Sequence, residues 1–210
     1  MMYVSPIRRT GFLGSTLRVS STFGMRKNPV TGKQLLHNGI DLAIPQGTPL
    51  FASAPGIVDD SDPTCSRKGP NGGFVIIKHA DGSKSAYVHM SRVDVRKGQQ
   101  VERWTQIGKS GGKKGDRCSG RSTGPHLHFI IRPNGKTAAN PIPLVNWYPF
   151  GLTYKGRQIP VTSRQWGGTV TQLRQLPWWI FALGGLAATV LVLGVTRRIP
   201  QRKRIRQLYV

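Results

Sequence analysis

Short apolar stretches alternate with turn residues from about Ser20 to Pro143, and this pattern predicts strands rather than helices. Examples are GIDLAIPQGTPLFA, GGFVIIKHADG and SAYVHM. Asp81 and Gly82 separate FVIIKH from SKSAYVH, and Asp-Gly is typical of the tight turn of a β-hairpin. The 26 glycines and 15 prolines also suit short strands joined by turns. Residues 20–143 are therefore predicted to form a mainly β domain.

The pattern changes near the carboxyl end. The nineteen residues from Trp178 to Thr196 carry no charge, and a helix of this length would span about 28 Å, close to the thickness of a bilayer core. Tryptophans at one end suit the membrane interface. We therefore expect one transmembrane helix over residues 177–196, which contacts lipid through residues 178–196, and a basic tail over residues 197–210.

Two further segments complete the predicted organisation. Residues 1–19 form an N-terminal segment without the continuous apolar core of a cleavable signal peptide. Residues 144–176 are polar and mixed, and we interpret them as a linker that contains some packed aromatic side chains: Trp147, Tyr148 and Phe150.

The basic tail also predicts an orientation for the membrane span. Six basic residues follow the span closely, so the positive-inside rule places the tail in the cytoplasm and the β domain on the other side. Without a signal peptide, the preceding residues need a dedicated export route, or the β domain is first made on the inner side. We expect a single-pass protein of the bacterial inner membrane that faces the periplasm, or of the membrane of a virus particle.

The net charge of +23, from 31 Lys and Arg against 8 Asp and Glu, favours anionic partners. Phospholipid headgroups, nucleic acid and the anionic polymers of a bacterial wall all qualify, and a solubilising surface is the plainer explanation. Nucleic acid would bind best at the basic tail, but attraction to anionic lipid, at about 1 kcal/mol per basic residue, explains the tail more simply. The sequence does not define an oligomeric state.

Histidines and one aspartate form the candidate chemical site. In RSTGPHLHFII, His126 and His128 would share one face of a strand, about 6–7 Å apart, so that one could bind a metal while the other works beside it. In HNGID, His37 and Asp41 are four residues apart. A catalytic zinc ion takes three imidazole or carboxylate ligands and keeps one open position. His37, Asp41 and one of the two neighbouring histidines would complete this set.

With these residues in place, the chain resembles the lysostaphin-type, or LytM-like, zinc endopeptidases, which cut bacterial cell-wall peptides. The resemblance runs from about Ser20 to Pro141. It is carried by STFGMRKNPVTGK, HNGIDLAIPQGTPLFASAPGIV, FVIIKHADGSKSAYVHM, VDVRKGQQV, IGKSGG and RSTGPHLHF followed by NP, in the family's order and spacing. It implies an antiparallel β-sheet (the duplicated hybrid motif) that forms the floor of a long groove, with peptidoglycan as the substrate.

The resemblance also implies a role for each site residue. Zinc ligands are expected at three positions and catalytic histidines at two others: His37, Asp41 and His128 as ligands, and His89 and His126 as catalytic residues. Chemically, the two catalytic imidazoles suit proton transfer and stabilisation of a developing oxyanion.

Two further residues, His79 and Tyr87, are expected to have structural roles. His79 lies just before the predicted hairpin turn and is not a ligand in the family. Tyr87 lies two residues before His89, which places both on the same strand face, and we expect Tyr87 to pack rather than to contact substrate. Gly39 is expected to let the chain bend between two ligands.

Some positions depart from the family pattern. Trp104 stands where a glycine is usual, and Lys113–Gly120 enlarges the loop before HLH. Cys65 and Cys118 do not have the spacing of a zinc site, and they are either two free thiols or one disulfide. Because Cys118 lies in the enlarged loop, we hypothesise a disulfide that clamps two walls of the groove.

The leading functional hypothesis is therefore a membrane-anchored zinc endopeptidase of peptidoglycan, suited to local penetration of the wall by a virus particle or a secretion machine. A non-catalytic relative that binds the wall or activates another hydrolase is a second hypothesis, but the retention of all five site residues argues against it. The third is a basic structural membrane protein of a virion.

Overall fold

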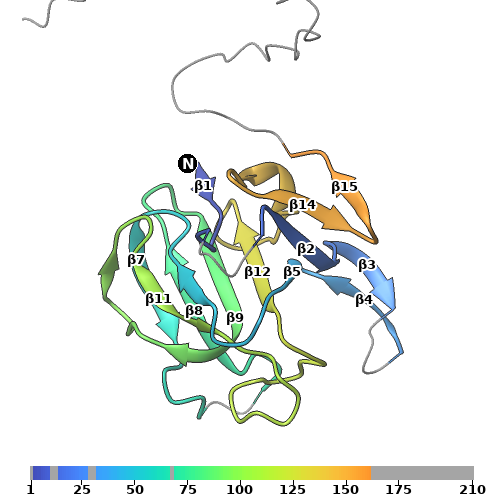
Figure 1. The fold of residues 1–210 in the computed structure, drawn as a ribbon. Helices are drawn as coiled ribbons and strands as arrows, with labels where there is room; N and C mark the ends of the chain where they lie inside the picture. Colours follow the sequence, from blue (N-terminus) through green and yellow to red (C-terminus); the bar gives the residue numbers. More distant parts are fainter. Residues whose placement is uncertain (1, 10–13, 28–31, 67–68, 162–210) are drawn as a thin grey trace, which may run out of the picture. The chain divides into compact units, whose positions relative to one another are not determined.

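We describe the protein from a computed structural model that covers residues 2–9, 14–27, 32–66 and 69–161, all within one compact unit (Figure 1). The predicted transmembrane helix over residues 177–196 and the tail over residues 197–210 lie outside the described residues. In the described ranges, no helix is long and apolar enough to cross a bilayer.

The fold is mainly β, as the sequence predicted. Eleven strands form one sheet: β2 (Thr16–Ser21), β5 (Ile40–Ala43), β6 (Pro49–Phe51), β7 (Gly56–Ser61), β8 (Gly73–Lys78), β9 (Lys84–Val93), β10 (Gln100–Val101), β11 (Gln106–Ser110), β12 (Leu127–Arg132), β14 (Gly151–Tyr154) and β15 (Arg157–Ile159). Two pairs of strands form separate small sheets: β1 (Tyr3–Val4) with β13 (Val145–Asn146), and β3 (Gly24–Lys27) with β4 (Gln34–His37). A short 3-10 helix covers Ile142–Leu144.

Four antiparallel neighbours, β8, β9, β12 and β5, form the centre of the sheet. The β8–β9 hairpin is confirmed, and its turn contains Asp81 and Gly82 as predicted. The Gly82 amide donates to the His79 carbonyl, and the His79 amide donates to the Ser83 carbonyl. Gly82 has a φ of 80°, which glycine adopts without strain.

Alternation along the central strands separates a core face from a groove face. On the core face Leu42, Tyr87 and Phe129 are completely buried. On the other face Asp41 and His128 lie opposite each other on β5 and β12. Because successive side chains of a strand point to opposite faces, the apolar positions of these strands build the core while the polar positions between them remain available to a site.

The core also holds the two residues that the sequence assigned to structural roles. His79 donates from Nδ1 to the Pro55 carbonyl at 2.8 Å, and its Nε2 lies 2.9 Å from the Ser85 hydroxyl. The Tyr87 hydroxyl donates to Ser53 Oγ at 2.8 Å. Burial lowers the pKa of His79 and raises the pKa of Tyr87. Both residues are therefore packed and hydrogen-bonded on the side away from the groove.

Residues 145–159 differ from the sequence-based expectation of a linker. β14 pairs in parallel with β2 and antiparallel with β15, so residues 151–159 widen the main sheet beyond residues 20–143, while β13 pairs with β1 in a separate sheet. The aromatic side chains behave differently from one another, because Trp147 and Phe150 are buried in the core whereas Tyr148 is 73% exposed. Short strands with few apolar positions carry little alternation, and packing against the existing core selects their conformation.

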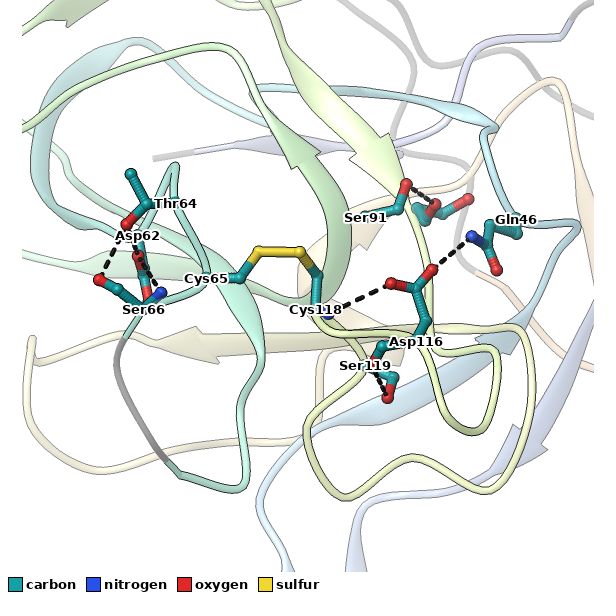
Figure 2. The surroundings of a disulfide bond; sticks show 10 residues. Gln46, Asp62, Thr64, Cys65, Ser66, Ser91, Asp116, Cys118 and Ser119 are labelled. Carbon is teal, nitrogen blue, oxygen red and sulfur yellow. Dashed lines mark hydrogen bonds between the residues drawn. A yellow bond between two sulfur atoms is a disulfide. The ribbon is translucent and has the colours of Figure 1, made fainter.

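Cys65 and Cys118 form a disulfide with a Cα–Cα distance of 5.2 Å, which confirms the pairing hypothesised from the sequence (Figure 2). The bond joins the loop before β8 to the loop before β12. Backbone hydrogen bonds reinforce this junction, since the Gly73 amide donates to the Cys118 carbonyl and the Arg121 amide donates to the Pro70 carbonyl. The two loops are therefore joined both by the disulfide and by backbone hydrogen bonds.

Candidate metal centre and catalytic histidines

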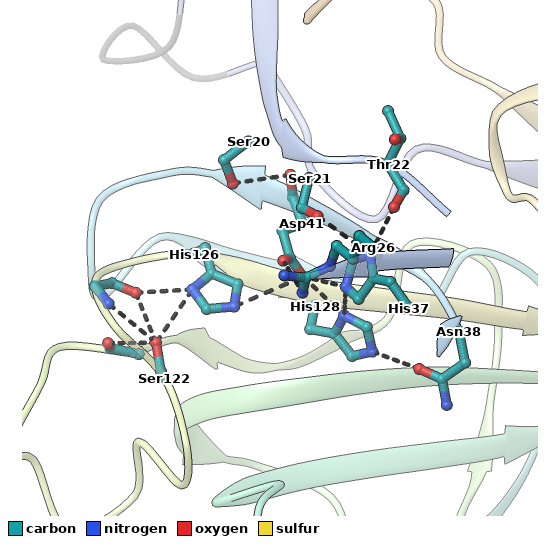
Figure 3. Close-up of polar contacts among 12 residues, drawn as sticks. Ser20, Ser21, Thr22, Arg26, His37, Asn38, Asp41, Ser122, His126 and His128 are labelled. Atoms are coloured by element: carbon teal, nitrogen blue, oxygen red, sulfur yellow. Dashed lines mark hydrogen bonds and ion pairs between the residues drawn. The ribbon is translucent and has the colours of Figure 1, made fainter. Parts of the chain in front are cut away.

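Three side chains bring their donor atoms together at the groove face (Figure 3). His37 Nε2 lies 3.1 Å from Asp41 Oδ1 and 3.0 Å from His128 Nδ1, and His128 Nδ1 lies 2.7 Å from the same carboxylate oxygen. The residues come from the end of β4, from β5 and from β12. These are the three positions that the sequence predicted as metal ligands, and they could hold a metal ion.

The hydrogen bonds behind the cluster orient both imidazoles toward the common point. His37 donates from Nδ1 to the Thr22 carbonyl at 2.8 Å, which leaves the lone pair of Nε2 directed inward. His128 Nε2 donates to Asn38 Oδ1 at 3.0 Å, which leaves the lone pair of Nδ1 directed inward. A partner on the remote nitrogen is the usual arrangement of a metal-ligating histidine. The donor set fits a catalytic zinc ion, which accepts imidazole nitrogen and carboxylate oxygen.

The electrostatics of the cluster keep its ligand atoms free of protons and available to a metal ion. Burial by itself would raise the pKa of Asp41, but the close contacts with the imidazoles of His128 and His37 outweigh burial and hold this pKa well below its ordinary value. Burial lowers the pKa of His128 despite the opposing effect of Asp41. The carboxylate is therefore ionised at neutral pH and His128 is biased toward its neutral form, which are the protonation states that a metal requires.

His126 lies beside this cluster without belonging to it. Its Nε2 is 3.7 Å from Asp41 Oδ1, and its Nδ1 donates to the Gly124 carbonyl at 2.7 Å, with the Ser122 hydroxyl also nearby at 3.2 Å (Figure 3). These contacts leave Nε2 directed at the groove. His126 can accept or donate a proton there without competing for the metal position.

His89 completes the group from β9. Its ring centroid lies 4.8 Å from that of His126 and 6.1 Å from that of His128. Burial, together with the nearby charges of His126 and His128, lowers the pKa of His89 to about 4, despite the opposing effect of the Asp41 carboxylate. His89 is therefore neutral at pH 7, the form of an imidazole that can accept a proton.

The prediction that Tyr87 and His89 share a strand face is wrong. On β8, Phe74 lies opposite Val88 of β9, and the preceding residue Gly73 lies opposite Met90. His89 therefore has no opposite residue on β8 and is the extra residue of a β-bulge. Its φ of 60° lies in the left-handed region. The bulge turns His89 to the groove that Val88 also lines, while Tyr87 stays in the core. Bulges often redirect a side chain beside a functional site in this way.

The cluster lies in a groove with a volume of about 560 Å³. One part of its lining comes from β3, β4 and the strand before them, including Ser21, Arg26 and Leu35. Another part comes from the disulfide-linked loops, including Asn71 and Arg121. The three candidate metal ligands and both further histidines thus line one groove.

Sequence reasoning missed three kinds of contributors to the site. Arg26 Nη2 lies 3.7 Å from Asp41 Oδ2. Asn38 orients His128, and its place inside HNGID was a signal that could have identified it. The carbonyl groups of Thr22 and Gly124 orient two other histidines, and no residue type could have revealed them because every residue carries a carbonyl.

The fold and this site agree with what comparisons with known proteins found. The model of peptidase family M23 matches residues 35–141, which is about half of the chain and includes all five site residues, four histidines and one aspartate. The chain belongs to this family.

Relatives within the family come from several bacteria. The chain is 42% identical over 125 residues to the DD-carboxypeptidase/endopeptidase Mpg of Neisseria meningitidis, covering 60% of this chain and 26% of that protein. It is 39% identical over 141 residues to the peptidoglycan DD-endopeptidase ShyA of Vibrio cholerae, covering 64% of this chain and 30% of that protein. The chain thus matches less than a third of the length of these curated relatives.

A solved structure shares the fold. The crystal structure of a zinc-containing peptidase from Vibrio cholerae has a TM-score of 0.53 and is 32% identical, covering 67% of this chain and 39% of that one. The mainly β architecture is therefore shared with this zinc-containing peptidase.

Proposed function

We propose that the protein is a zinc metalloendopeptidase that hydrolyses peptide bonds in the stems or cross-bridges of bacterial peptidoglycan. The observation that carries the proposal is the convergence of His37 Nε2, Asp41 Oδ1 and His128 Nδ1 beside two further histidines in an open groove. The similarity to peptidoglycan endopeptidases of the same family supports this substrate.

The residues of the chain suit each part of a peptide hydrolysis. A zinc ion held by His37, Asp41 and His128 would supply a Lewis acid that polarises the scissile carbonyl. His126 presents Nε2 to the groove, and its fixed Nδ1–H bond to Gly124 orients the ring for proton transfer. His89 is neutral at pH 7 and lies close enough to His126 to act on the same peptide group.

We also propose a single membrane anchor over residues 178–196, with residues 197–210 on the cytoplasmic side. The absence of charge over this segment, the tryptophans at one end and the basic residues that follow it support the anchor. The peptidase domain would then act from the bacterial inner membrane on the periplasmic wall, or from the membrane of a virus particle. A basic surface would favour contact with the anionic wall.

A zymogram on purified wall material tests the enzymatic proposal. The wild-type chain is compared with His126→Ala, with zinc-stripped protein and with stripped protein to which zinc is returned. We expect clearing only by the first and the last, and mass analysis of the released fragments identifies the bond that is cut. His126→Ala should retain its metal, because His126 is not among the three converging donors. Equal clearing by all samples contradicts the proposal, and clearing by none favours a wall-binding relative.

A further inference from the structure

Few charged side chains line the groove. Among its described lining residues, Arg26 and Arg121 are the cations and Asp41 is the carboxylate. A divalent ion at the candidate metal centre would add positive charge to the same lining. The groove therefore favours an anionic ligand over a neutral one of the same shape, because opposite charges attract more strongly where protein excludes part of the solvent.

The two arginines differ in what surrounds them. Arg26 extends from β3 to within 3.7 Å of Asp41, so its charge already faces a carboxylate of the protein (Figure 3). Arg121 is exposed, and none of the carboxylates in the described part of the chain forms an ion pair with it. All eight acidic residues lie in that part of the chain. Among the described residues, Arg121 is thus a groove-lining cation without an anionic partner.

The backbone of Arg121 is nevertheless held in place. Its amide donates to the Pro70 carbonyl at 2.9 Å, and the disulfide lies three residues before it. Gly120 has a φ of 58°, and a Cβ there would lie 2.3 Å from the Pro70 carbonyl oxygen, so the two loop backbones are in direct contact. A side chain that projects from a fixed backbone loses less freedom on binding than one on a loose loop.

We propose that Arg121 binds a free carboxylate of the substrate peptide and makes the groove selective for stems that carry one near the scissile bond. This inference rests on the proposed function. A guanidinium group matches a carboxylate with two parallel hydrogen bonds, which makes the contact directional as well as charged. The carboxylate comes either from a side chain of a diamino acid residue in the stem or from the carboxyl end of the peptide.

Three versions of one synthetic cross-linked stem peptide test the inference with the full-length chain. The first has both carboxylates free, the second has the side-chain carboxylate converted to the amide, and the third has the terminal carboxylate converted to the amide. We expect one of the two amidations to lower kcat/KM of the wild type by about tenfold, the usual scale of a charge-assisted hydrogen bond. The amidation that does so identifies the source of the carboxylate.

Matched variants separate Arg121 from the general basic charge. Arg121→Gln should hydrolyse the preferred peptide and its amide at equal rates. Arg117→Gln removes the same charge from the same loop at an exposed position that does not line the groove, and it should keep the wild-type preference. Unchanged zinc content and thermal stability show that both variants are folded.

The outcomes distinguish this inference from the proposed function. Equal kcat/KM of the wild type for all three peptides, or a preference that survives in Arg121→Gln, overturns the role of Arg121 while the peptidase stands. Hydrolysis of none of the peptides overturns the proposed function instead. Calorimetry of the same peptides with zinc-stripped protein then decides the binding role separately, since Arg121→Gln must abolish the difference between acid and amide if the inference holds.

Discussion

At the scale of single residues, backbone conformation decides where the chemistry can occur. His89 reaches the groove because its φ of 60° inserts a bulge into β9. A non-glycine residue in this region costs on the order of 1–3 kcal/mol, which the surrounding sheet must offset. Trp104 has a φ of 70° and stands where the family usually has a glycine, so the turn it occupies retains the conformation that glycine adopts more readily.

Gly39 is needed for space rather than for bending. It lies between the proposed ligands His37 and Asp41, and its φ is outside the left-handed range. A Cβ at this position would lie 2.4 Å from the Phe129 carbonyl oxygen and 2.9 Å from Cε1 of His128. The absence of a side chain therefore lets β12 and its metal ligand approach the turn after β4.

Gly39→Ala should weaken metal binding by about 10- to 100-fold, the range seen when groups that position ligands are disturbed. The added methyl must push β12 or the His128 ring away from the common point. Zinc content after dialysis against a competing chelator measures the effect. Gly14→Ala serves as the control, because a Cβ there meets nothing within 4 Å and its φ is unstrained. Equal zinc affinity in the two variants contradicts this account.

At the scale of elements, the register between strands brings the proposed metal ligands together. β12 pairs with β5 so that His128 lies directly opposite Asp41. His37 ends β4 in a separate two-stranded sheet, and the chain enters the main sheet only at Ile40. The ligands therefore come from two sheets that meet at one turn, and a slip of one residue between β5 and β12 would move His128 to the core face.

Loss of the disulfide should lower the free energy of unfolding by about 2–4 kcal/mol, because the bond closes a long loop between cysteines 53 positions apart. The Cys65→Ser/Cys118→Ser double variant should also lower kcat/KM, since the linked loops carry Asn71 and Arg121 into the groove. Its zinc content should not change, because the ligands lie on or at the ends of β4, β5 and β12.

Urea unfolding with and without reductant measures the effect of the disulfide. Reductant should destabilise the wild type to the level of the double variant and leave the double variant unaffected. A double variant as stable as the oxidised wild type would show that the backbone hydrogen bonds alone hold the two loops together.

At the scale of the whole molecule, charge is divided unevenly along the chain. All acidic residues lie between residues 41 and 116, within the peptidase fold, whereas the segments on either side carry basic charge alone. The peptidase domain is followed along the chain by a segment with the composition of a membrane span and then by a strongly basic tail. The proposed anchor would keep the groove near a membrane surface and within reach of a wall beside it.

The full chain should remain in the membrane pellet after extraction with alkaline carbonate, and a chain that ends at residue 176 should be soluble. The reason is that residues 178–196 would bury a continuous apolar helix in lipid. A chain that lacks only residues 197–210 is the control, and it should stay in the pellet because the apolar segment is intact. Release of the full chain by carbonate would instead indicate peripheral binding through basic charge.

The sequence by itself determined the strand-rich fold, the β8–β9 hairpin and the identity of the residues that could bind a metal. These depend on local information, because alternation, turn residues and donor chemistry are properties of neighbouring positions. The resemblance to known peptidases then grouped His128 with the distant pair His37 and Asp41, and the fold brings the side chains of all three together.

Only the tertiary structure decided the bulge at His89, the pairing of Cys65 with Cys118, the carbonyl groups that orient the histidines and the inclusion of residues 151–159 in the main sheet. Each depends on which distant segments pack together. A register shift needs two strands, and a carbonyl becomes a specific acceptor only when folding brings a donor to it.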